Sequence, residues 1–153
     1  MKKKIQFTGD ARVIIDKVTP CIEGGLFPFK SVIGDTIHVN ADIFLDGHDK
    51  ISAVAQYRKR GEKAWKETPL TFVANDNWLG EFTPEKVGVY EYNVAAWVNE
   101  FATWLHGLHK KADEDQDLSL EFLIGAKLIE QCSERANNDD AKSLTKYAET
   151  LKY

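Results

Sequence analysis

Apolar and polar residues alternate along much of the first hundred positions of the chain. Within residues 36–45 the apolar side chains recur at every second position, and polar side chains occupy most of the positions between them. This alternation is typical of a strand with one buried and one solvated face. Further short runs, separated by turn residues, cover residues 13–18, 51–57, 78–82 and 89–98. The pattern predicts a mainly β fold, an antiparallel sandwich of about seven strands.

Turn residues support this interpretation. Asp46, Gly47, His48 and Asp49 form a predicted structural turn in which glycine supplies a positive φ and the Asx residues cap the backbone. In residues 87–92 a tyrosine follows the corner made by a glycine, which resembles the tyrosine corner of immunoglobulin-like sandwiches. The sandwich is therefore predicted to be immunoglobulin-like.

The hydrophobic period changes near residue 106. From there apolar residues follow a helical spacing in two adjacent stripes, made by Leu118, Phe122, Gly125, Ile129 and Cys132 and by Leu120, Ile124 and Leu128. This predicts a helix over residues 117–136. After an Asn-Asn-Asp-Asp break, a second helix is predicted over residues 139–152. We therefore divide the chain into a sandwich domain, residues 1–105, and a helical hairpin, residues 106–153.

Composition excludes several classes of protein. The 153 residues are 43% hydrophobic and 29% charged, with a formal net charge of -4, which favours one folded domain and disfavours a nucleic-acid partner. The basic run Lys2–Lys4 precedes no apolar stretch, so neither a signal peptide nor a membrane anchor is indicated. Cys21 and Cys132 lie far apart and are interpreted as reduced. The sequence predicts a cytoplasmic protein without a membrane partner.

Motifs that carry chemistry are absent from the sequence. No phosphate-binding glycine loop, serine nucleophile elbow, Cys-x-x-Cys pair or zinc-protease motif is present. His106 and His109, with Asp113 or Asp117, could form a metal site on a helix, but solvated histidines at a domain junction are the favoured interpretation. The chain is expected to bind no metal and no cofactor, and to have no catalytic residues of its own.

Aromatic residues raise one further possibility. Trp65 and Trp78, among four tryptophans, could stack against pyranose rings, although most of the indoles are expected in the core. The turn Asp46–Asp49 could be mistaken for a calcium loop, but it has no completing glutamate. It is interpreted as a structural turn.

Five blocks of residues occur in order along the chain. They are Arg12-Val13-x-Ile15-x-x-Val18-x-Pro20, Gly25-x-Phe27-Pro28-x-Lys30, Gly34-Asp35, Ala41-Asp42-x-Phe44-x-Asp46-Gly47-His48-Asp49 and Phe101-Ala102-Thr103-Trp104-x-His106-Gly107. Together they resemble the N-terminal domain of the α-1,4-glucan:maltose-1-phosphate maltosyltransferases. The resemblance implies a sandwich with a helical insertion ahead of an amylase-like (β/α)8 barrel, which transfers maltosyl units with retention of configuration. It also implies that the chain ends before the return strand of the sandwich and before the barrel.

Three functions follow as hypotheses. The first is a non-catalytic scaffold and dimerisation domain, whose partners are its own barrel and a second copy of the chain. Phe122, Leu128, Leu144 and Leu151 are its candidate interface residues. The second is a carbohydrate-binding module that holds α-glucan through Trp65 and Trp78. The third, an independent hydrolase built on scattered carboxylates, has the least support.

Overall fold

The computed structural model describes residues 12–152, which form two compact units. The first contains residues 12–47 and 51–98, and the second contains residues 48–50 and 99–152. The basic run Lys2–Lys4 lies outside the described residues. Among the helices of residues 12–152, none has the length and apolar character needed to cross a membrane.

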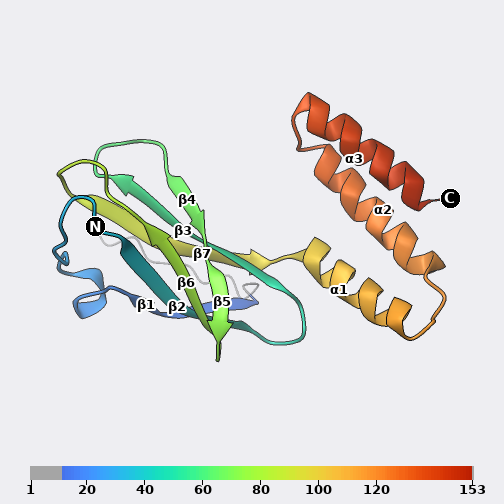
Figure 1. Ribbon diagram of the computed structural model, residues 1–153, viewed down its shortest axis with the longest axis horizontal. Helices are drawn as coiled ribbons and strands as arrows, with labels where there is room; N and C mark the ends of the chain where they lie inside the picture. Colours follow the sequence, from blue (N-terminus) through green and yellow to red (C-terminus); the bar gives the residue numbers. More distant parts are fainter. Residues whose placement is uncertain (1–11, 153) are drawn as a thin grey trace, which may run out of the picture. The chain divides into compact units, whose positions relative to one another are not determined.

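The first unit is a sandwich of two antiparallel sheets (Figure 1). One sheet has the strand order β1-β2-β6-β5, with bounds Val13–Thr19, Ile37–Leu45, Asn77–Phe82 and Thr71–Ala74. The other has the order β4-β3-β7, with bounds Lys66–Pro69, Ile51–Lys59 and Tyr90–Val98. The predicted mainly β sandwich with a helical appendage is confirmed, and the immunoglobulin-like subclass stays a prediction.

Alternation along the central strands builds the core. On β2 the alternate residues Ile37, Val39, Ala41 and Ile43 are buried, as the sequence pattern indicates. Ala53 and Ala55 of β3 face them from the other sheet, and Leu70 and Phe82 complete the buried cluster. Tyr57 stacks on Phe82 with ring centroids 4.2 Å apart, so the core continues to the end of the sandwich.

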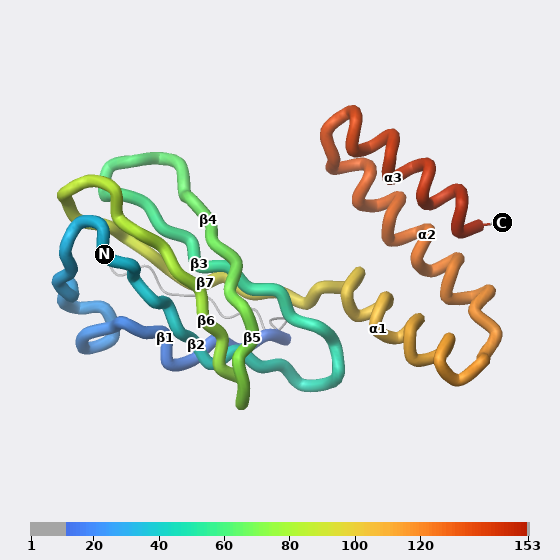
Figure 2. Tube along the Cα trace, viewed as in Figure 1, coloured from blue at the N-terminus to red at the C-terminus, as the bar shows by residue number. Residues whose placement is uncertain are grey.

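The second unit contains three helices rather than the two predicted (Figure 2). They are α1, Glu100–Asp113; α2, Ser119–Ser133; and α3, Asn138–Leu151. The side chain of Asn99 accepts a hydrogen bond of 2.9 Å from the backbone N–H of Ala102, which caps the start of α1. The main segment of the helical unit thus begins at Asn99, whereas the boundary was placed at residue 106 from the sequence.

Small residues let α2 and α3 pack closely as an antiparallel pair. Ala126 and Ile129 of α2 and Ala148 of α3 are buried, and Leu144 and Leu151 pack against them. At the start of α2, Asp117 accepts hydrogen bonds from the hydroxyl and the backbone N–H of Ser119, and these bonds hold its pKa below its ordinary value. Asp117 thus binds one of the backbone N–H groups that lack a partner within the first turn of α2.

Trp104 joins α1 to α2. Its indole Nε1 donates a hydrogen bond of 2.8 Å to the carbonyl of Glu121. A Cβ added to Gly125 would lie only 2.0 Å from Cζ2 of this indole, so the ring occupies the space left by the missing side chain. The packing of α1 on α2 therefore requires glycine at position 125.

Candidate interaction surfaces

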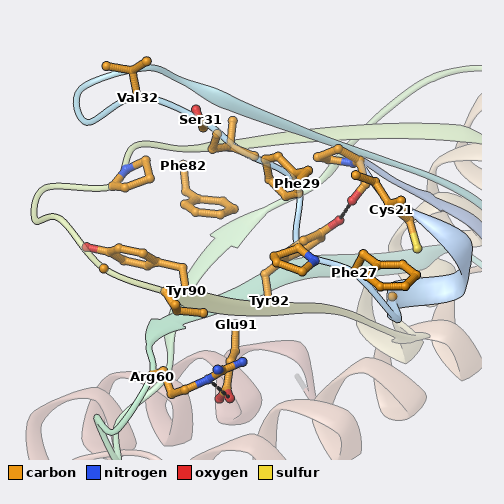
Figure 3. Close-up of a pocket in the computed structure, with 18 of the residues that line it drawn as sticks. Cys21, Phe27, Phe29, Ser31, Val32, Arg60, Phe82, Tyr90, Glu91 and Tyr92 are labelled. Atoms are coloured by element: carbon orange, nitrogen blue, oxygen red, sulfur yellow. Dashed lines mark hydrogen bonds and ion pairs between the residues drawn. The ribbon is translucent and has the colours of Figure 1, made fainter.

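A groove of about 890 Å³ opens at one end of the sandwich (Figure 3). We call it the end groove. Its walls are the loop at residues 20–33, which contains the short 3-10 helix η1, Glu23–Gly25, and the segment 84–92 that leads into β7. Four aromatic rings line it, those of Phe27, Phe29, Tyr90 and Tyr92, and Phe82 of the core lies at its base.

Exposed aliphatic side chains surround the end groove. Leu26 is 77% exposed and Val87 is 81% exposed, and both belong to its lining. Val32, Ile33 and Ile22 are also exposed there. An apolar cluster of this kind on a protein surface is typical of an interaction site.

Hydrogen bonds hold the walls of the end groove together. The hydroxyl of Tyr92 donates to the carbonyl of Pro20, which ties the loop to β7. Burial is the main cause that raises the pKa of Tyr92 to about 12. The N–H of Gly34 donates to the carbonyl of Pro84 at 3.3 Å. The two walls are therefore fixed relative to each other.

Glu91 and Arg60, which line the end groove, are paired with each other. Arg60 Nε lies 3.3 Å from Glu91 Oε1, and Arg58 contacts the other oxygen of the same carboxylate at 3.0 Å. The hydroxyl of Tyr90 accepts a hydrogen bond of 3.3 Å from the backbone N–H of Lys86. Both carboxylate oxygens of Glu91 thus have cationic partners, which does not favour a role as a general acid.

The predicted turn Asp46–Asp49 contains the expected strained glycine. Gly47 has a φ of +122°, a conformation that residues with a Cβ rarely adopt. A guanidinium nitrogen of Arg12 donates to the carbonyl of Asp46 at 3.3 Å. His48 and Asp49 follow the glycine in the chain, and their part in the turn stays a prediction.

Replacement of Gly47 tests whether this turn is structural. Gly47→Val is expected to lower the free energy of unfolding by about 1–3 kcal/mol, because valine must adopt the same backbone conformation under strain. His48→Ala is expected to change it by less than about 0.5 kcal/mol. Urea unfolding of both variants checks this, and equal small effects would instead indicate a binding role for the loop.

The tryptophans proposed to bind sugar are already engaged. The guanidinium carbon of Arg58 lies 4.2 Å from the ring centroid of Trp65 and covers one face of that indole. Trp78 donates from Nε1 to the carbonyl of Ile43 at 3.2 Å and meets the ring of Phe72 edge to face. The structure does not bring Trp65 and Trp78 together as one stacking platform.

The interface residues suggested from the sequence are distributed over both sides of the helical unit. Leu144 and Leu151 pack inside the α2–α3 pair, and Phe122 and Leu128 are half-buried on α2. Three large apolar residues of α2 are exposed, and their spacing places them on one face: Leu120, Leu123 and Ile124. We call these three residues the α2 face.

The histidines near the predicted junction lie on α1 and are exposed. The charge of Lys50, first, and then desolvation and Lys110 lower the pKa of His106. Within the described part of the chain, no cluster of three or more His, Cys, Asp or Glu side chains has the geometry to hold a metal ion.

Comparison with known proteins gives one consistent result. A model of the family described as "Alpha-1,4-glucan:maltose-1-phosphate maltosyltransferase, domain N/S" matches residues 11–153. A protein of that enzyme name from Chlorobaculum tepidum is 47% identical over 145 residues, which are 95% of this chain and 22% of the relative. Proteins of the same name from Methylacidiphilum infernorum and Myxococcus xanthus are 37% and 38% identical to this chain, over 85% and 92% of its length. The chain spans about a fifth of the length of these relatives.

Proposed function

The chain belongs to the α-1,4-glucan:maltose-1-phosphate maltosyltransferase family, and we propose that it is the non-catalytic scaffold and dimerisation domain of such an enzyme. In this proposal the remainder of the polypeptide is an amylase-like barrel. The barrel extends α-1,4-glucans from maltose 1-phosphate with retention of configuration, in the cytoplasm. The observation that carries the proposal is the match of nearly the whole chain to about a fifth of each relative.

The outer edge of β7 supports the role as part of a larger protein. β7 is the last strand in the order β4-β3-β7, has nine residues, and contains Glu91 as its one charged residue. The other edge strands carry protective features: β4 and β5 have four residues each, and β1 has a register shift between Asp16 and Thr19. A long edge without such features is a template for another strand.

Burial along β7 leads to the same conclusion. Tyr92, Val94 and Ala96 pack against the core but are only partly buried, whereas Ala53 and Ala55 on the adjacent β3 are buried. A strand added to the free edge of β7 would cover these side chains and complete the second sheet. We propose that the remainder of the polypeptide supplies it, as the resemblance to the family implies.

The α2 face supports the proposed dimer. Leu120 is 65% exposed and Leu123 is 53% exposed, although each is large and apolar. Because both side chains are exposed, the α2–α3 contact leaves most of their surface uncovered. A second copy of the chain can cover the α2 face across a two-fold axis, since the surface is then paired with itself.

Carbohydrate binding by Trp65 and Trp78 has less support. A sugar that stacks on an indole needs an open ring face, and Arg58 leaves at most one such face on Trp65. Trp78 is held by its hydrogen bond and by Phe72.

An assay of phosphate release tests the non-catalytic role. The purified chain, given maltose 1-phosphate and a maltooligosaccharide acceptor, is expected to release no phosphate above the buffer rate. Catalysis of this transfer needs a positioned nucleophile and acid, and Glu91 of the end groove is ion-paired instead. The full-length Chlorobaculum tepidum relative is the positive control. Sustained release that disappears on replacement of a single carboxylate of this chain would contradict the proposal.

A further inference from the structure

We propose that the end groove is the surface on which the catalytic remainder of the maltosyltransferase polypeptide docks. The inference rests on the proposed function and adds to it the site of contact. It concerns the groove between the loop at residues 20–33 and the segment 84–92, which shares no residue with the α2 face.

The chemistry of the end groove fits a polypeptide partner. Leu26 and Val87 extend from its two walls with most of their surface exposed, and Phe27 is 57% exposed beside them. Burial of such side chains is favourable by about 25 cal/mol for each Å² of apolar area removed from water. Aliphatic side chains of this kind are the ones that protein contacts bury, whereas sugars require hydrogen-bonding groups as well as aromatic faces.

Two polar contacts of the end groove are visible in Figure 3. Arg60 pairs with Glu91, and the hydroxyl of Tyr92 donates to the carbonyl of Pro20. A glucan chain would have to compete with these bonds to satisfy its own hydroxyl groups. An apolar segment of protein can fill the groove while the bonds remain intact.

The end groove is also formed before any partner binds. The bond between Tyr92 and Pro20 fixes one side of the loop, and the bond between Gly34 and Pro84 fixes the other. Phe29 packs edge to face on Tyr92 with ring centroids 6.3 Å apart. A preformed surface loses little conformational entropy on binding, and this favours specific over non-specific binding.

The length of the related proteins indicates which partner occupies the end groove. The chain matches 22% of the Chlorobaculum tepidum protein, so most of a related polypeptide lies outside the part described by this structure. A segment tethered to the same chain has a high effective concentration at the groove, so a surface of modest area is sufficient. A rim rich in aliphatic residues is typical of a permanent contact rather than a transient one.

The test compares the isolated chain with a chimera in which the chain replaces the matched segment of the Chlorobaculum tepidum relative. Backbone hydrogen exchange is followed for residues 22–33 and 84–89, and alkylation by N-ethylmaleimide is followed at Cys21, which is exposed and lines the end groove. In the chimera both rates are expected to fall by about tenfold or more. The double substitution Leu26→Lys and Val87→Lys in the chimera should return them to the rates of the isolated chain. Val73→Lys, at a residue that is 58% exposed on β5, should leave them slow.

Three results would overturn the proposal. Equal rates in the chimera and the isolated chain would mean that the end groove stays open. Protection that grows with the concentration of the isolated chain would assign the groove to a second copy. Protection of the isolated chain by maltoheptaose alone would assign it to glucan.

Two further measurements keep the test decisive. If the chimera does not fold, hydrogen exchange is measured on the corresponding loops of the unmodified Chlorobaculum tepidum relative, where fast exchange would overturn the proposal. Sedimentation of the same samples separates the proposed dimer from the proposed docking at the end groove. A monomeric chimera with a protected groove contradicts the dimer but supports the docking. A dimeric chimera with an unprotected groove contradicts the docking alone.

Discussion

Gly125→Ala is expected to destabilise the helical unit by about 2 kcal/mol, although alanine is the better helix former by about 1 kcal/mol. The new Cβ would lie 2.0 Å from Cζ2 and 2.5 Å from Cε2 of Trp104. The indole cannot move away without losing its hydrogen bond to the carbonyl of Glu121. The clash therefore outweighs the gain in helix propensity.

Gly107→Ala is the matched control for this prediction. Gly107 lies inside α1, and a Cβ there meets no atom within 4 Å outside its own helix and chain neighbours. This variant is expected to stabilise the unit by up to about 1 kcal/mol, since only the helix propensity changes. Urea unfolding followed at 222 nm compares the two variants. Equal stabilisation by both would contradict the packing of Trp104 against Gly125.

Leu123→Asp is expected to weaken self-association of the chain by about 100-fold or more, which corresponds to about 2.7 kcal/mol. In the proposed dimer the new carboxylate would be buried against the α2 face of the second copy, and its desolvation would have no compensating partner. Leu123 is exposed in the single chain, so the fold itself should tolerate the change. The far-ultraviolet circular dichroism spectrum of the variant should therefore equal that of the unmodified chain.

Two variants of the sandwich serve as controls for Leu123→Asp. Val73→Asp adds the same charge at a residue of similar exposure on β5 and is expected to leave the dimer intact. Val87→Asp adds the same negative charge at the end groove and is also expected to leave the dimer intact. Sedimentation equilibrium of the three variants makes the comparison. Dissociation by Val87→Asp instead of Leu123→Asp would move the self-association surface from α2 to the end groove.

The sandwich could be predicted from the sequence because its central strands alternate cleanly. On β2 the predicted apolar face is the one that the structure buries, from Ile37 to Ile43. The short strands β4 and β5 were not singled out, because four residues such as Lys66–Pro69 are too few to show a period. Their position is set by pairing with β3 and β6.

The first helix was not recognised for a different reason. α1 begins directly after β7, so the apolar residues of the strand continue into those of the helix and hide the change of period. Asn99 was the available signal, since asparagine is a preferred N-cap residue and its side chain caps Ala102. The predicted helices at 117–136 and 139–152 correspond to α2 and α3, with ends shifted by a few residues.

The α2 face and the end groove were the parts of the structure that the sequence predicted least well. Sequence periodicity placed two apolar stripes on α2 but could not show that Leu120, Leu123 and Ile124 remain exposed, because this depends on how α3 packs. The end groove had a signal that was not used, namely a loop between two strands that contains many large apolar residues, from Ile22 to Ile33. Apolar residues in a loop rich in glycine and proline are not explained by strand packing, and they indicate a contact surface.

Sedimentation equilibrium of the unmodified chain over a concentration series tests the scaffold and dimerisation role most directly. We expect a monomer–dimer equilibrium with the dimer dominant at high micromolar concentration, because the α2 face is apolar and exposed in the single chain. A chain that stays monomeric throughout that range would contradict the α2 face as a self-sufficient interface. Any dimer of the proposed full-length enzyme would then have to be formed by the rest of its polypeptide.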